Sequence, residues 1–304
     1  MHHPAASWLA FGSVVLLLLG LELGVISRVR TPTIGQAAWW SVVVIACAAI
    51  FGAVLFAIEG HPAALQFATG YVVEFSLSVD NLLVFIMILQ YFAVPPPLQS
   101  VALKWGILGA IVMRGLMIGG GAAVLRELEW VIYLLGALLI ITGIKMLARP
   151  VEATVRVESN PLLRAARRVL PLSEDFAGSA FFVRHAGKLV ATPLLLVVLA
   201  VEWTDLMFAT DSIPAIFAIT RDPFLIYTSN ILAVVGLRAL YFVLAAMIGR
   251  FAYLGVGVGT VLILVGGKML AAHWLTVPTG ATLLGVVLVL GMSVIASLIA
   301  EKRR

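Results

Sequence analysis

The stretch from Glu74 to Phe85 reads EFSLSVDNLLVF, and the stretch from Val201 to Phe217 reads VEWTDLMFATDSIPAIF. Both lie in apolar runs that are long enough to cross a bilayer. A carboxylate at the bilayer centre costs roughly 2.5–3.5 kcal/mol on insertion scales, so the acids in these runs need compensating interactions. Acids at such positions usually mark a path for an ion, a proton or a substrate. The two stretches therefore predict a functional site inside the membrane.

The composition of the whole chain supports a membrane location. Hydrophobic residues make up 62% of the 304 residues, charged residues make up 12%, and the mean hydropathy is +1.11. So few charges could not cover the surface of a soluble protein of this length, and the composition predicts a multi-pass membrane protein. Cys47 is the single cysteine, which excludes an intrachain disulfide and any cysteine-based zinc or redox site.

Apolar runs of about 17–25 residues predict an all-α fold with nine transmembrane helices in a single domain over residues 1–304. The expected helices are Ser7–Ile26, Trp39–Ile58, Phe67–Phe92, Lys104–Leu125, Trp130–Leu147, Val190–Thr220, Tyr227–Gly249, Phe251–Leu270 and Ala281–Ile299. No Lys or Arg precedes the first run, so we expect it to be a retained helix and not a cleaved signal peptide.

The distribution of basic residues predicts the orientation. If the N-terminus is outside, fifteen Lys and Arg residues fall on the cytoplasmic side and three fall outside. We therefore expect an outer N-terminus, a cytoplasmic C-terminus, and a cytoplasmic loop over about residues 149–189, in the inner (cytoplasmic) membrane of the cell. Residues Asn160–Leu170 in this loop predict a short basic amphipathic helix, which would lie on anionic lipid or, alternatively, dock a regulator.

The chain contains an internal repeat. GALLIITGIKMLA (Gly136–Ala148) matches GTVLILVGGKMLA (Gly259–Ala271) at eight of thirteen positions, and a similar alignment upstream pairs Arg114 with Arg238. Helices three to five (about 67–148) then correspond to helices six to eight (about 190–271), and one final helix follows at 281–299. Because each repeat has an odd number of helices, the alignment predicts a 3+3 inverted-topology repeat, which is typical of secondary transporters with a site near the membrane midplane.

The second acidic stretch places its carboxylates on one helix. Glu202 and Asp205 are three residues apart and share a face. Asp211 would converge with them only if the helix is distorted. Pro214 lacks an N–H group and clashes with the preceding turn, so it predicts a helix break that frees the carbonyl of Thr210.

The first stretch divides its polar groups between two faces. Glu74 and Asn81 share one face, and Asp80 lies on another. Arg114 and Arg238 fall near the centres of their helices and are the expected counter-charges. Pairing with them would make some of the acids structural.

Carboxylate, amide and carbonyl oxygens form a hard ligand set, which suits Mn²⁺, Mg²⁺ or Ca²⁺ better than Cu(I) or Zn²⁺. The candidate metal-site residues are Glu74, Asp80, Asn81, Glu202, Asp205 and Asp211. The five acids outnumber Arg114 and Arg238, so the site is expected to hold a divalent cation or exchangeable protons.

At these residues the chain resembles the TerC/Alx family of integral membrane proteins, from about Glu22 through the last helix. The most specific parts are EFSLSVDNLLVF and FATDSIPAIFAITRDPF (Phe208–Phe224). The resemblance implies Mn²⁺ export or the supply of manganese to exported enzymes, with the six candidate residues lining the metal path. The chain departs from the family pattern at Glu22, where an aspartate is expected, and at Phe75, Trp203 and Thr210.

Two functions remain open from the sequence. The first is a secondary transporter that exports Mn²⁺ as its substrate, with protons as the expected coupling ion. The alternative is a membrane assembly or metal-delivery partner for exported proteins, with no transport cycle of its own. The chain contains neither an HExxH nor a GxSxG motif, so we expect no enzymatic activity, no prosthetic group and no nucleic-acid partner. Membrane lipid is the remaining expected partner.

Overall fold

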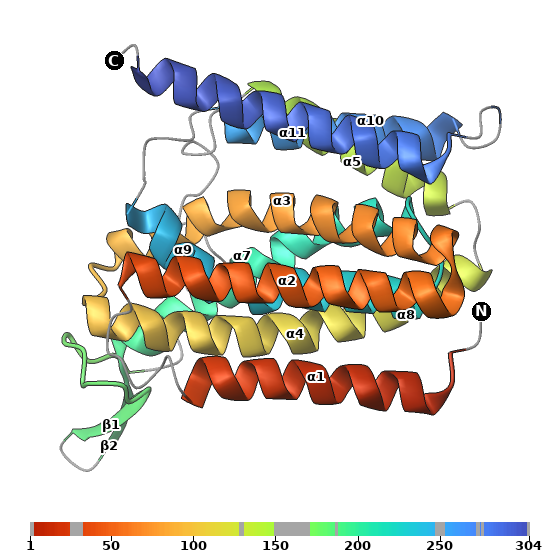
Figure 1. Cartoon of the computed structure of the whole chain (residues 1–304). Coiled ribbons are helices and arrows are strands. Elements are labelled where there is room, and N and C mark those ends of the chain that lie inside the picture. Colours follow the sequence, from red (N-terminus) through yellow and green to blue (C-terminus); the bar gives the residue numbers. More distant parts are fainter. Residues whose placement is uncertain are drawn as a thin grey trace.

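The computed structural model describes residues 3–24, 33–127, 131–148, 171–185, 188–246, 253–271, 274 and 277–302. The helices are α1 (Ala5–Gly24), α2 (Ile34–Glu59), α3 (His61–Tyr91), α4 (Pro96–Glu127), α5 (Val131–Ala148), α7 (Pro193–Phe217), α8 (Pro223–Val235), α9 (Leu237–Ala246), α10 (Leu254–Ala271) and α11 (Thr279–Lys302). Figure 1 shows them stacked with their axes roughly side by side, with α5, α10 and α11 together on one side of α3.

The helices are those of a multi-pass membrane protein. Among the described residues, six helices are long and apolar enough to cross a membrane, and a seventh span results if the bent pair α8–α9 counts as one. The α5 and α10 helices are shorter but apolar. Large apolar side chains such as Leu16 on α1, Val42 on α2 and Leu284 on α11 are exposed, as expected for faces that contact lipid. The nine-span count, the inverted repeat and the orientation stay predictions.

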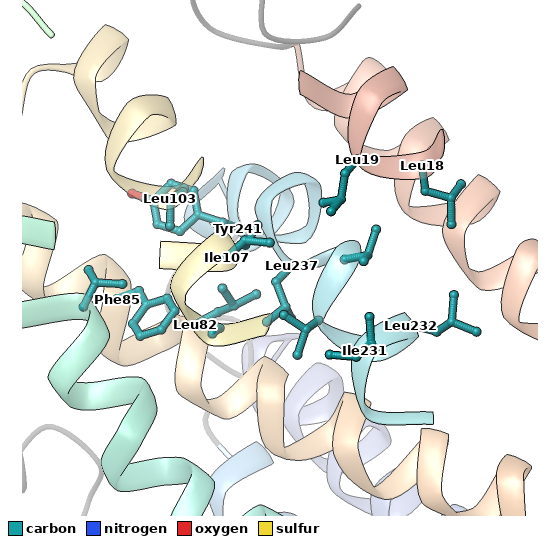
Figure 2. Packing of buried hydrophobic residues seen from close by; sticks show 14 of the residues in the cluster. Leu18, Leu19, Leu82, Phe85, Leu103, Ile107, Ile231, Leu232, Leu237 and Tyr241 are labelled. Atoms are coloured by element: carbon teal, nitrogen blue, oxygen red, sulfur yellow. The ribbon is translucent and has the colours of Figure 1, made fainter. Parts of the chain in front are cut away.

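The α3 helix is the centre of the fold. In its apolar segment 75% of the residues are buried, whereas only 17% are in α2 and 11% in α11. It contacts helices from both sides of the molecule, including α8, α7, α2 and α11. Figure 2 shows the packing beside it, where Leu82 and Phe85 of α3 meet Ile107 of α4 and Leu237 and Tyr241 of α9. The first acidic stretch therefore lies on the most enclosed helix.

The α5 and α10 helices pack closely through glycines. A Cβ atom on Gly143 would lie 2.5 Å from the carbonyl oxygen of Gly259, and one on Gly266 would lie 2.7 Å from that of Gly136. Small residues permit this backbone approach. The lower-numbered glycine of each helix meets the higher-numbered glycine of the other, so the two helices are antiparallel.

Local signals explain where several helices begin. Thr33 and Gln36 form a capping box at the start of α2. Asp222 accepts a hydrogen bond from the backbone N–H of Phe224 at 2.9 Å and caps α8, with Pro223 at its first position. Asp222 also contacts the ring of His3, which ties the N-terminal residues to this end of the bundle.

The predicted cytoplasmic loop contains structure that the sequence reading did not anticipate. Strands β1 (Phe182–His185) and β2 (Lys188–Ala191) form an antiparallel pair in which Phe182 faces Ala191. The sixth predicted helix accordingly begins at Pro193 and not at Val190, because Val190 belongs to β2. The predicted basic helix, Asn160–Leu170, lies outside the described residues.

The helix predicted as Tyr227–Gly249 is interrupted by a bend. This segment is divided at Gly236 into α8 and α9, which meet at a bend of 44°. The helix break predicted at Pro214 is not seen: α7 continues through this residue and ends three residues later at Phe217, so the proline lies in the last turn.

Candidate functional site

A fully buried arginine lies at the junction of four helices. Arg114 of α4 is 0% exposed, and its Nη1 donates to Oε1 of Glu74 on α3 and, at 3.2 Å, to Oδ1 of Asn230 on α8. Its Nη2 and Nε donate to the two carboxylate oxygens of Asp205 on α7, at 3.0 and 3.3 Å. This paired geometry is the strong, planar form of the arginine–carboxylate interaction. Arg114 therefore fixes the relative positions of α3, α4, α7 and α8.

Two buried carboxylates share this one guanidinium. Glu74 is 0% exposed and Asp205 is 3% exposed, so the three ionised groups would carry one net negative charge away from water. Ser78 adds a hydroxyl that donates to Oε1 of Glu74 at 3.4 Å. Within the part of the chain described, Oε2 of Glu74 and Nδ2 of Asn230 are buried without a hydrogen-bond partner. The centre thus combines excess negative charge with an unused carboxylate oxygen.

Glu202 lies one turn before Asp205 on α7, against a glycine of α4. Its carboxyl group occupies the space that a Cβ atom on Gly109 would fill. Gly106 has the same relation to Val201, whose Cγ1 would lie 2.8 Å from an added Cβ. These two glycines let α4 approach α7 closely enough for a half-buried acid to fit between them.

The remaining candidate residues are placed less completely. Asn81 is buried on α3, on the same helix as Glu74. Asp80 and Asp211 lie in α3 and α7, but their side chains are outside what the structure describes. Among the described side chains, no group of three or more His, Cys, Asp or Glu residues is arranged to hold a metal ion. The described residues bring together Glu74, Asp205 and Arg114.

The second predicted counter-charge, Arg238 of α9, lies in a separate buried centre. It is 2% exposed, its Nη2 donates to Oγ of Ser100 on α4 at 2.7 Å, and its Nη1 approaches the backbone carbonyl of Glu22 on α1 at 3.5 Å. Glu22 is itself 1% exposed. Among the described side chains, Arg238 forms no hydrogen bond or ion pair with Glu74, Glu202 or Asp205.

Sequence reasoning missed several polar residues of these two centres. Asn230, Ser78 and Ser100 were not identified, although each is a polar residue in an apolar helix and could have been recognised on that ground. Glu22, by contrast, stood out in the sequence as the only acid of the first apolar run. The sequence offered no signal for which acid would meet which arginine.

An apolar cavity lies between the two centres. Its two charged lining residues are Asp205 and Arg238, and apolar side chains of α3, α4, α7, α8 and α9 form the rest of its wall. Leu82, Ile107 and Leu237, which are visible in Figure 2, belong to that wall. The cavity therefore connects a carboxylate bound to one arginine with the other arginine.

Comparisons with known proteins agree with this architecture. The profile of the integral membrane protein TerC family matches residues 59–304. An uncharacterized membrane protein of Myxococcus xanthus is 42% identical over 97% of this chain and 92% of its own length. A protein of Escherichia coli strain K12 is 42% identical over 91% of this chain and 89% of its own, and its name contains the words "membrane-bound redox modulator Alx".

A more distant relative is an uncharacterized membrane protein of Rickettsia felis, which is 34% identical over 97% of this chain and 98% of its own length. No solved structure matches the chain. The resemblance noted in the sequence is thus confirmed over most of the chain, and this protein belongs to the TerC family of integral membrane proteins.

Proposed function

We propose that this protein is a secondary transporter that exports a divalent metal ion, with Mn²⁺ as its substrate, from the cytoplasm across the inner membrane. The observation that carries the proposal is the pair of buried acids, Glu74 and Asp205, that share Arg114 between membrane-length helices. Excess acid in this setting is costly and suits a cation path. Glu202 adds a further carboxyl group one turn away.

The donor chemistry supports a hard divalent cation as the substrate. In this proposal the unused Oε2 of Glu74 accepts the metal first, and Asp205 exchanges part of its contact with Arg114 for the ion. Asp80, Asn81 and Asp211 would complete the ligand set from the same two helices. All of these donors are oxygens, which favour Mn²⁺ or Mg²⁺ over softer metals.

The α5–α10 contacts support an inverted repeat. The sequence alignment equates Gly136 with Gly259 and Gly143 with Gly266. The contact of Gly143 with Gly259 is then the same contact as that of Gly266 with Gly136, seen from the other repeat. A self-complementary contact of this kind is expected around a two-fold axis. Such an axis between the repeats would let the protein expose one site alternately to the two sides of the membrane.

The second candidate function is a membrane assembly or metal-delivery partner for exported proteins. The observation in its favour is the β1–β2 hairpin, on which Phe182 is 43% exposed and Leu189 is 60% exposed. A redox role suggested by the name of the Escherichia coli relative could not use disulfide exchange within this chain, because Cys47 is the single cysteine.

The test is Mn²⁺ uptake into everted vesicles or proteoliposomes, with and without a pH gradient. We expect uptake by the wild type that is driven by the gradient and lost in Asp211→Asn. Asp175→Asn is the matched control, because Asp175 is an exposed acid outside the helices and its loss should leave uptake unchanged. No uptake by folded, correctly oriented wild-type protein would reject the transporter and favour the assembly partner.

A further inference from the structure

Glu22 differs from Glu74 and Asp205, the other fully buried acids that the structure describes, in having no hydrogen-bond donor. Its side chain is 1% exposed, and among the described residues neither carboxyl oxygen has a partner. Glu74 and Asp205 are equally buried, but both are ion-paired with Arg114. An ionised carboxylate without a donor is strongly disfavoured away from water, whereas the neutral acid is tolerated. The arrangement around Glu22 is therefore that of a carboxyl group that holds a proton.

Arg238 lies close to Glu22 but does not donate a hydrogen bond to its carboxyl group. Arg238 of α9 is the one charged side chain, in the part described, that acts electrostatically on Glu22. Its Nη2 donates to Ser100 of α4, and its Nε is buried without a partner. Trp40 of α2 places its indole Nε1–H beside the carboxyl group outside hydrogen-bond geometry. Neither Ser100 nor Trp40 titrates, so among the described side chains around Glu22 only Arg238 can compensate a charge on its carboxyl group.

Arg238 also faces the cavity that ends at Asp205. When Glu22 is neutral, no carboxylate among the described side chains is paired with Arg238, so its positive charge opposes a divalent cation in that cavity. When Glu22 loses its proton, the carboxylate and Arg238 neutralise each other and the opposition disappears. Because charges interact strongly in a medium of low dielectric, the change in charge at Glu22 alters the electrostatic energy of a cation in the cavity.

We propose that Glu22 is the proton site of the transporter, and that Arg238 transmits its protonation state to the metal site at Asp205. The inference rests on the proposed function and names the residue for its coupling ion. In each cycle one proton leaves the Glu22 carboxyl as Arg238 turns from Ser100 to the carboxylate and the cation enters. Return of the proton frees the charge of Arg238 and expels the cation. By linkage, the metal weakens proton binding by the same factor that the proton weakens metal binding.

The first experiment measures Mn²⁺ binding to the purified full-length protein at several pH values. Glu22→Gln imitates the neutral acid permanently, so we expect about tenfold weaker Mn²⁺ binding at neutral and alkaline pH, a typical size for such coupling. The variant should also release fewer protons per Mn²⁺ bound than the wild type. Glu22→Asp, which keeps a titratable carboxyl group, should restore both properties in part.

The double variant Glu22→Gln/Arg238→Gln separates coupling from structure. Removing the uncompensated charge should return Mn²⁺ affinity toward the wild-type value and leave it independent of the proton at this site. A merely structural role for the two residues predicts that the double variant binds no better than Glu22→Gln. That result, or wild-type affinity and proton release in Glu22→Gln, would overturn the proposal.

A chemical probe gives a readout that does not depend on metal. Dicyclohexylcarbodiimide reacts with protonated carboxyl groups in apolar surroundings, so it should label Glu22 in the wild type at neutral pH and do so less when Mn²⁺ is bound. Absence of label on Glu22 in folded protein contradicts the proposal even if the variants fold poorly. If Glu22 is labelled but the wild type neither binds nor transports Mn²⁺, the proposed transport function is rejected, whereas the protonated state of Glu22 stands.

Discussion

Arg114 of α4 holds both carboxylate oxygens of Asp205 on α7, through Nη2 at 3.0 Å and Nε at 3.3 Å. The same guanidinium also contacts Glu74, so the centre has more acid than base. An arginine in this position has two opposing effects, one on the stability of the fold and one on metal binding. It stabilises the packing of four helices, and in the proposed transporter it would compete with the metal ion for the two acids.

Removal of Arg114 should destabilise the fold. Arg114→Gln leaves Glu74 and Asp205 buried without their counter-charge, and loss of one partner of a buried pair typically costs about 3–5 kcal/mol. We expect a clearly lower melting temperature for the detergent-solubilised protein. Arg184→Gln is the control, because Arg184 is exposed on β1 and its replacement should change stability by less than about 0.5 kcal/mol. Equal melting temperatures for the two variants would contradict this account of the centre.

Gly109 should control the position of Glu202. A methyl group at this position overlaps the Glu202 carboxyl, so Gly109→Ala should push the acid away and cost about 1–3 kcal/mol of stability. Gly119→Ala on the same helix is the matched control, since nothing lies within 4 Å of its added Cβ. The control should be neutral or slightly stabilising, because alanine favours helix.

Gly109→Ala and Gly119→Ala can be compared by Mn²⁺ uptake as well as by thermal unfolding. If Glu202 contributes to the metal path, Gly109→Ala should lower uptake while Gly119→Ala leaves it unchanged. The double variant Gly109→Ala/Glu202→Gln should then be no worse than Gly109→Ala alone, because both changes act on the same carboxyl group. Equal behaviour of the two alanine variants would argue against the tight contact between α4 and α7.

The sequence predicted the positions of most helices but not which side chains pair between them. Length and hydropathy placed the helices because lipid accepts only apolar segments with satisfied backbones. The bend at Gly236 was not predicted, since glycine in an apolar run more often signals close packing, and the break predicted at Pro214 is absent because α7 continues through it. The hairpin starting at Phe182 was missed because it is short and amphipathic. Whether Arg238 meets Glu22 or a motif acid depends on how α1 packs, which no local pattern reveals.

His3 should anchor the N-terminal residues. Its Nδ1 lies 3.3 Å from Oε1 of Glu59 and its Nε2 lies 2.9 Å from Oδ2 of Asp222, while its ring stacks on Phe224 at 4.4 Å. His3→Ala should therefore release the start of α1, with faster hydrogen exchange there and a loss of about 1 kcal/mol, typical of a hydrogen bond. His61→Ala is the control, because His61 is exposed at the start of α3. Unchanged exchange in His3→Ala would show that the contacts do not restrain the segment.

The glycine contacts between α5 and α10 allow the inverted repeat to be tested directly. Gly143→Ala and Gly266→Ala change equivalent positions of the two proposed repeats, and each added Cβ would lie within 2.7 Å of a backbone oxygen on the facing helix. A backbone atom cannot move aside as a flexible side chain can, so we expect each variant to lose about 1–3 kcal/mol of stability. Gly267→Ala, with open space around its Cβ, should be tolerated.

If the repeats are related by a two-fold axis, Gly143→Ala and Gly266→Ala should lower the melting temperature by similar amounts. The double variant should cost less stability than the sum of the two single variants, once the helices have separated. A large effect of one variant beside a neutral effect of the other would contradict the symmetric contact.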